Sequence, residues 1–154
     1  MAADGGRATA LTAGAAYRFE LTWSPDGRRI ALTMDIDGNL DIGIVEANGG
    51  ELQRVTNDAA VDVEPTWSPD GSAFYYVSAR GGSFNIWRRV LSTDADERVV
   101  RGIQPAVSPD GRQLAFVAEV PGRLGSGGLW VMDLPAGTPL LVHDEESEYR
   151  ARPT

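Results

Sequence analysis

The residues with the strongest metal-binding character lie in the string D-I-D-G-N-L-D. It places oxygen-bearing side chains at four alternating positions, Asp35, Asp37, Asn39 and Asp41. Oxygen ligands at this spacing suit Ca²⁺, and Glu46 falls at the twelfth position of the run. An EF-hand loop, however, requires glycine at its sixth position, where this chain has Leu40. We therefore expect a hairpin turn at residues 37–39 between two strands, with a calcium site as the alternative.

A second group of ionisable residues surrounds His143, the only histidine, in V-H-D-E-E-S-E-Y-R. Its acidic neighbours are Asp144, Glu145, Glu146 and Glu148. A zinc site usually needs three or four protein ligands, and the chain has no cysteine to supply them. The segment is expected to be a solvated acidic loop that follows the last strand of a repeat. A metal-binding cluster is the alternative.

Nucleophilic catalysis finds little support in the sequence. Ser24, Ser68 and Ser108 would each need a neighbouring base, and the chain has one histidine. The G-x-S-x-G, Walker A and dinucleotide-binding glycine patterns are all missing from the sequence. Nothing in the sequence brings the two carboxylate-rich loops together as an acid and base pair. We predict no catalytic residue and no cofactor for this chain.

The three serines belong instead to a repeated turn. The turn reads W-S-P-D-G twice and V-S-P-D-G once, comprising Trp23, Ser24, Pro25, Asp26 and Gly27, then Trp67, Ser68, Pro69, Asp70 and Gly71, and finally Val107, Ser108, Pro109, Asp110 and Gly111. The copies are 44 and then 40 residues apart. Serine, proline and aspartate suit the first three positions of a type I turn, and glycine accepts the left-handed conformation that closes a hairpin. We predict that the motif is a structural turn.

Short apolar runs follow each turn at similar distances and predict the rest of the unit. The first of them are I-A-L-T-M, F-Y-Y-V-S and L-A-F-V-A, and two further runs come after each. No segment of ten residues has a clean helical period. Four short strands in a repeat of about 44 residues are typical of a β-propeller blade, whose middle strands are covered on both faces. We predict an all-β fold of three four-stranded antiparallel blades, at residues 13–56, 57–100 and 101–142.

The aromatic residues recur in register with these strands. Trp23 and Trp67 occupy one repeat position, and Trp87 and Trp130 occupy another. Aromatic residues at a fixed register favour packing between blades over a ligand platform. We therefore expect all four to belong to the core.

The W-S-P-D-G turn, the D-G-N-L-D-I hairpin, the N-I-W and L-W-V-M-D-L strands and the E-P-T-W lead-in resemble the TolB-type propeller repeat. The resemblance runs from about residue 11 to the end, although Val107 replaces the expected tryptophan in the third copy. It implies an extracytoplasmic protein from a family of typically six-bladed propellers. Similar repeats also occur in propeller domains attached to amidohydrolases and prolyl-oligopeptidase-like peptidases.

The amino-acid composition and charge limit the kinds of partner that the chain can have. The net charge is −8 with no basic cluster, which disfavours nucleic acid as a ligand. No run of about 20 apolar residues predicts a membrane span, and the N-terminus lacks the apolar core of a signal peptide.

The two ends of the sequence suggest what completes the fold. Residues 1–12 are expected to supply an outer strand to a preceding or partner blade, and residues 143–154 to lead into a further blade. Three blades do not close a ring. The expected partners are thus another protein, further blades of the same chain, or a second copy in a six-bladed ring. The function indicated is a non-catalytic interaction scaffold, and the alternative is the N-terminal propeller of a larger hydrolase.

Overall fold

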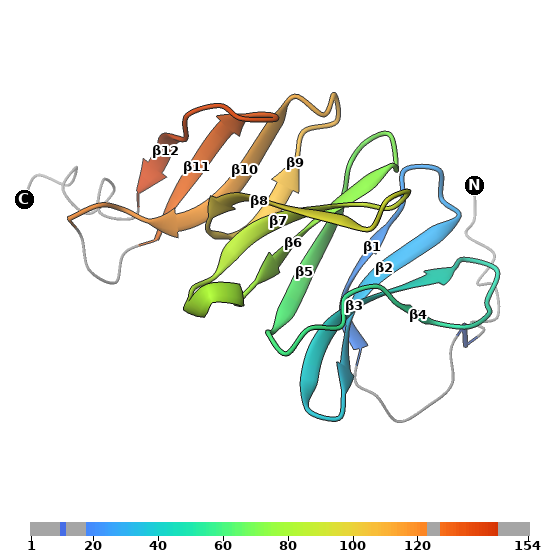
Figure 1. Cartoon of the computed structure of the whole chain (residues 1–154). Coiled ribbons are helices and arrows are strands. Elements are labelled where there is room, and N and C mark those ends of the chain that lie inside the picture. Colours follow the sequence, from blue (N-terminus) through green and yellow to red (C-terminus); the bar gives the residue numbers. More distant parts are fainter. Residues whose placement is uncertain (1–9, 12–17, 123–126, 145–154) are drawn as a thin grey trace, which may run out of the picture.

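Three antiparallel sheets of four strands lie side by side in an open arc (Figure 1). The computed structural model describes residues 10–11, 18–122 and 127–144. Blade 1 contains β1 (Arg18–Trp23), β2 (Arg29–Ile36), β3 (Asn39–Glu46) and β4 (Gln53–Arg54). Blade 2 contains β5 (Asp62–Trp67), β6 (Ala73–Ser78), the short 3₁₀ turn η1 (Arg80–Gly82), β7 (Asn85–Val90) and β8 (Ala95–Arg101). Blade 3 contains β9 (Ile103–Val107), β10 (Gln113–Glu119), β11 (Gly127–Asp133) and β12 (Leu140–Asp144). The predicted all-β fold of three four-stranded blades is confirmed.

The S-P-D-G sequence forms the hairpin between the first two strands of every blade. In blade 1 the Gly27 N–H donates to the Ser24 carbonyl over 2.9 Å, which closes the turn, and Gly27 has the positive φ of 68°. The Ser24 hydroxyl donates to Asp26 Oδ1 over 2.6 Å and accepts the Arg29 N–H over 2.9 Å. The second and third turns repeat these bonds. The motif thus forms the same hydrogen-bonded turn in all three blades.

Each innermost strand contains a β-bulge that the sequence did not reveal. Glu20, Glu64 and Gln104 occupy the same repeat position and have φ values of 55°, 56° and 54°. At these bulges the Glu64 N–H donates to Glu20 Oε2 over 2.9 Å, and the Gln104 N–H donates to Glu64 Oε2 over 2.6 Å. A carboxylate of one blade thus receives a backbone N–H of the next, which holds the inner strands of successive blades together.

Two apolar clusters fill the spaces between neighbouring blades. The cluster between blades 1 and 2 contains Ala31, Ile42, Ile44, Trp67, Phe74 and Tyr76. The cluster between blades 2 and 3 contains Tyr75, Val77, Ile86, Leu114, Phe116 and Met132. Residues 74–77 of β6 belong alternately to the two clusters, and all six residues of this strand are buried. The middle strands of blade 2 are therefore covered on both faces, as expected for the central unit of a stack.

The two ends of the arc differ. On the first face of blade 1, the buried cluster of Ile30, Leu32, Met34 and Val45 is in contact with Leu11. Most of the strand predicted at residues 1–12 lies outside the described residues. Its two described members, Ala10 and Leu11, do not form a strand. On the last face of blade 3, Leu129 and Leu140 are 42% and 69% exposed.

Candidate functional site

The residues of the calcium candidate make structural contacts, and Asn39 donates its side-chain amide to Asp41 Oδ2 over 3.2 Å. Asp35 Oδ1 accepts the Gly38 N–H over 2.9 Å, and both Asp37 and Gly38 have positive φ, as a two-residue type I′ hairpin requires. Asp41 is fully buried, and its Oδ2 lies 2.6 Å from Arg54 Nη2. Among the described residues, no three acidic, histidine or cysteine side chains gather as metal ligands would. The expected hairpin is present at this position.

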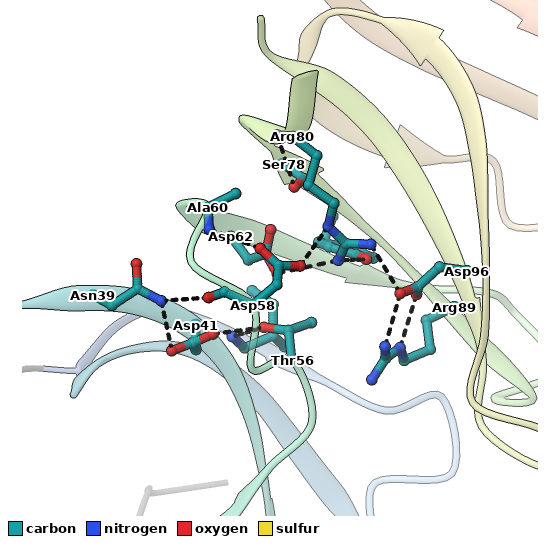
Figure 2. A network of polar contacts seen from close by, with 12 residues as sticks. Asn39, Asp41, Thr56, Asp58, Ala60, Asp62, Ser78, Arg80, Arg89 and Asp96 are labelled. Carbon is teal, nitrogen blue, oxygen red and sulfur yellow. Dashed lines mark hydrogen bonds and ion pairs between the residues drawn. The ribbon is translucent and has the colours of Figure 1, made fainter. Parts of the chain in front are cut away.

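Beside Asp41 a network of charged side chains fills the outer boundary between blades 1 and 2 (Figure 2). We define the Arg80 cluster as Asp58, Asp62, Arg80, Arg89 and Asp96. The guanidinium of Arg80 makes ion pairs of 2.6 Å with Asp58, 3.3 Å with Asp62 and 3.0 Å with Asp96. Arg89 binds the two carboxylate oxygens of Asp96 over 2.8 Å each. The cluster thus joins the blade-connecting segment, the start of β5, η1 and the two outer strands of blade 2.

Arg80 also packs on aromatic rings. Its guanidinium carbon lies 4.8 Å from the centroid of the Trp87 ring and 5.5 Å from that of Tyr76. Planar guanidinium groups stack well on aromatic faces while still donating in their own plane. One arginine therefore covers the two rings and neutralises acids from three segments.

The acids of the cluster differ in pKa. Burial raises the pKa of Asp62, against the opposing effects of a hydrogen bond with Ser78 and the charge of Arg80. Burial also acts to raise the pKa of Asp96, but hydrogen bonds from Arg89 and Arg80 outweigh it and the pKa is lowered. A buried carboxyl with a raised pKa is common at catalytic sites. Here Asp62 is fully buried and paired with Arg80, an arrangement that also serves a purely structural ion-pair network.

The serine hydroxyl of each repeated turn donates a hydrogen bond to the aspartate two residues later. Hydrogen bonds from the Ser68 hydroxyl, and then from the Ser72 N–H and hydroxyl, lower the pKa of Asp70 to about 2. The equivalent bonds from Ser24 and Ser108 lower the pKa of Asp26 and Asp110. These hydroxyls donate to a carboxylate, and no histidine is among their hydrogen-bond partners. They lack the neighbouring base that a serine nucleophile needs.

We expect Ser68→Ala to raise the pKa of Asp70 towards its ordinary value, because the largest stabilising bond to the carboxylate is removed. A carboxylate with a depressed pKa in the folded state stabilises the fold above its unfolded pKa and loses this effect as the pH falls towards 2. Stability of the unmodified chain should therefore fall between about pH 4 and pH 2, and less steeply in the variant. Carboxyl NMR titration and urea unfolding would measure both effects. An unchanged pKa of Asp70 would contradict the assignment, and Ser92→Ala in an exposed turn is the control.

The structure corrects the placement of His143. The residue was expected in a loop, but β12 extends through Asp144, and His143 pairs with Leu129 of β11. His143 is exposed, and the acids Glu145, Glu146 and Glu148 lie outside the described residues.

The four tryptophans divide by position in the arc. Trp67 is 5% exposed, packs in the cluster between blades 1 and 2 and donates its indole N–H to the Thr22 carbonyl over 3.2 Å. Trp87 and Trp130 are partly buried against the same two inter-blade clusters. Trp23 was also expected in the core but is 59% exposed. It occupies the position of Trp67 in the first blade of the arc, where the described residues include no preceding blade for it to contact.

The sequence did not single out the Arg80 cluster or two pockets at the boundary of blades 2 and 3. A signal for the cluster was available in the aligned repeats, since Asp62 and Arg80 of blade 2 correspond to Gly102 and Val120 of blade 3. Charged residues at positions that are apolar in the next repeat indicate a local role beyond packing. The first pocket has a volume of about 750 Å³ and the second about 470 Å³.

No helix among the described residues has the length and apolar character needed to cross a membrane.

A comparison with curated proteins finds no significant match. Among solved structures, TolB from Acinetobacter baumannii is similar with a TM-score of 0.75 and 27% identity, covering 81% of this chain and 32% of that one. Oligogalacturonate lyase from Vibrio parahaemolyticus has a TM-score of 0.65 and 16% identity, covering 87% of this chain and 42% of that one. An acylaminoacyl peptidase from Pyrococcus horikoshii has a TM-score of 0.57 and 18% identity, covering 77% of this chain and 23% of that one.

These structures share the stacked four-stranded blades, and the chain spans about a third of the TolB structure that it matches. The family model described as the TolB beta propeller domain matches residues 4–134, which include all three S-P-D-G turns and most of blade 3. The chain therefore belongs to the TolB β-propeller family.

Proposed function

We propose that this chain is a non-catalytic propeller segment that acts as a scaffold for protein interactions. The observation that supports it most is the distribution of its side chains. The turn serines and the buried acids are engaged in internal hydrogen bonds and ion pairs, whereas the apolar last face of blade 3 is exposed. Exposed apolar surface of this kind is typical of an interaction site.

The last face of blade 3 suggests the chemistry of its partner. It carries Leu129, Val131 and Leu140, which register places on one side of the sheet with Ala115 and Val117 of β10. The corresponding face of blade 1 receives Trp67 of the next blade, whose indole N–H donates to the Thr22 carbonyl. We propose that the partner is a further blade of the same type. It is supplied either by more of the same polypeptide or by a second copy that contributes its exposed Trp23 and completes a six-bladed ring.

Charge on this face should prevent such an association. We expect the purified chain to form a dimer by light scattering, and the double variant Leu129→Asp and Leu140→Asp to be a monomer, since two buried carboxylates at an apolar contact are strongly unfavourable. Ser92→Asp in the exposed β7–β8 turn is the control and should leave the dimer intact. A monomeric unmodified chain with a cooperative melt would rule out the second copy as partner. The remaining test would then be binding of separately expressed flanking segments.

A second candidate is the propeller module of a larger enzyme. Oligogalacturonate lyase and acylaminoacyl peptidase share the fold, and each is longer than the part that this chain covers. In such a protein the segment would position or admit substrate while another domain performs the reaction. The parent reading frame distinguishes the two, because a hydrolase domain beside the blades would favour this candidate. Ester or amide hydrolysis by the isolated chain that is lost in His143→Ala would overturn the non-catalytic proposal. An extracytoplasmic location is also proposed, on the basis of the family alone.

A further inference from the structure

The boundary of blades 2 and 3 contains two adjoining pockets that share three lining residues. The larger pocket is mostly apolar, and its lining includes Val100, Phe116, Ala118, Val120, Trp130 and Pro139. The smaller one is lined on the other side by Phe84, Ile103 and Val117. Both include Ala118, Arg101 and Glu119. Phe84 is 50% exposed, although it is a large apolar side chain. We refer to these two adjoining pockets together as the groove.

The preceding boundary shows what fills this space when the chain supplies an occupant itself. There Arg80 lies over Tyr76 and Trp87, which face each other across β6 and β7. In blade 3 the matching pair is Phe116 and Trp130, which face each other across β10 and β11. Val120 stands at the position of Arg80, and its short side chain cannot reach over both rings. The larger pocket is therefore the space that the Arg80 side chain occupies one blade earlier.

The charges of the two boundaries differ in the same way. The partners Asp62 and Asp96 of Arg80 correspond to Gly102 and Pro139 in blade 3, as the strand registers show. Asp58 has no counterpart, because Gly102 alone separates β8 from β9. Among the described lining residues the carboxylate is that of Glu119, which is 69% exposed, so a cationic occupant would find no buried carboxylate among them. Burying an unpaired charge is costly, so the pocket favours a neutral apolar group.

The exposed edge shared by both pockets offers one donor and one acceptor. Arg101 Nη2 and Glu119 Oε2 lie 3.3 Å apart, and their side chains are 68% and 69% exposed, so this pair is weak and free to rearrange. A neutral peptide unit can accept from the guanidinium and donate to the carboxylate. A fatty-acid carboxylate could accept from Arg101 but would meet the like charge of Glu119, and it has no N–H to donate to that acceptor. The pair is thus complementary to a polypeptide backbone.

We propose that this groove binds an extended peptide segment, with a neutral aromatic or aliphatic side chain in the larger pocket and its backbone amide hydrogen-bonded to Arg101 and Glu119. The inference rests on the proposed scaffold function and assigns it a second contact site, which adjoins the last face of blade 3 at Val117. It names the chemistry of the partner as an apolar, uncharged segment of a protein.

The test uses the whole chain and capped tripeptides as probes. Acetyl-Ala-Phe-Ala-amide should shift the amide signals of Ala118 and Glu119 and the indole signal of Trp130 in ¹⁵N NMR spectra. The matched probes with arginine or glutamate in the centre should bind at least roughly tenfold more weakly. Octanoate serves as the fatty-acid probe. Stronger binding of octanoate than of the phenylalanine peptide, or shifts confined to other surfaces, would overturn the proposal.

Two variants test the pocket itself. Val120→Arg places in blade 3 the residue that blade 2 has at this position and should weaken binding of the phenylalanine peptide roughly tenfold. Ser92→Arg, which adds the same charge elsewhere, should not. If Val120→Arg fails to fold, Glu119→Lys at the exposed edge replaces it and should weaken binding by removing the acceptor. Unchanged binding in the folded variant would contradict the proposal. A peptide that fails to bind while Leu129→Asp and Leu140→Asp still abolish association would reject the groove but retain the scaffold.

Discussion

Replacing Arg80 by alanine is expected to destabilise the protein by about 3 kcal/mol, the lower end of the range for removing one partner of a buried ion pair. The cost comes from the groups that lose their partner when the guanidinium is removed. Asp62 is fully buried and would lose its arginine, and Asp58 and Asp96 would lose one contact each. The faces of Trp87 and Tyr76 would also lose the guanidinium that covers them. The lower end applies because the Arg80 side chain is still 23% exposed, so water can partly replace it.

Equilibrium unfolding in urea would measure this effect against two matched variants. Arg101→Ala breaks the exposed ion pair with Glu119 and should cost less than about 0.5 kcal/mol. Arg80→Lys keeps the charge, but one ammonium cannot replace three guanidinium nitrogens that each pair with a different carboxylate, so its cost should be intermediate. Equal costs for Arg80→Ala and Arg101→Ala would contradict the assignment of the cluster as a structural centre.

The free-energy cost of Arg80→Ala should depend on pH. Burial raises the pKa of Asp62 in the folded protein, and loss of the neighbouring arginine charge raises it further. A carboxyl with a raised pKa in the folded state binds its proton more readily there than in the unfolded chain. It therefore destabilises the fold increasingly as the pH rises from its unfolded pKa to its folded pKa. The cost of Arg80→Ala should therefore shrink on acidification from pH 7 to pH 4. A cost that is constant over this range would show that Asp62 is not the charge left unpaired.

The contrast between the Arg80 cluster and the S-P-D-G turns explains what the sequence could reveal. The turn is determined by four consecutive residues, because Ser24, Asp26 and Gly27 bond to one another and to the adjacent backbone. Three copies in one chain then define the blade and the fold. The cluster depends on side chains from five segments between Asp58 and Asp96, and no local pattern links them. Its geometry required the packing of blade 1 on blade 2.

The position of each blade in the arc also limited what the sequence could predict. Repeat reasoning assigned Trp23 and Trp67 the same environment because their local sequences are the same. Their exposure differs because each ring packs on the blade before its own. The bulges at Glu20, Glu64 and Gln104 were missed for a related reason. Their bulges are linked by bonds between neighbouring blades, and neither glutamate nor glutamine is a residue that signals positive φ.

We expect Trp67→Ala to destabilise the protein by about 3–5 kcal/mol, the range for removing a buried aromatic residue. Trp67 packs against Ala31, Ile42 and Ile44 of blade 1, and its ring meets Phe74 in an edge-on arrangement with centroids 6.3 Å apart. Arg29 of blade 1 lies over the same ring, 4.8 Å from its centroid. The substitution would leave a cavity at the centre of the boundary between blades 1 and 2 and remove the indole hydrogen bond to Thr22.

Trp23→Ala is the matched control, because it removes the same side chain from the same repeat position. With 59% of the residue exposed, its cost in the dilute, unassociated chain should be below about 1 kcal/mol. Urea unfolding of both variants at two protein concentrations separates the two environments. Trp67→Ala should be equally costly at both concentrations, since its cavity lies within one chain.

The concentration dependence of Trp23→Ala connects stability with the proposed assembly. If a second copy covers Trp23, association stabilises the unmodified chain by mass action, and the variant loses this contribution only at high concentration. The cost of Trp23→Ala should then rise towards that of Trp67→Ala as the chain associates, and Leu129→Asp with Leu140→Asp should remove the rise. A cost that stays small at every concentration in an associated chain would show that Trp23 is not part of the contact. A large cost in the dilute chain would show instead that Trp23 is packed within its own blade, contrary to its exposure in the structure.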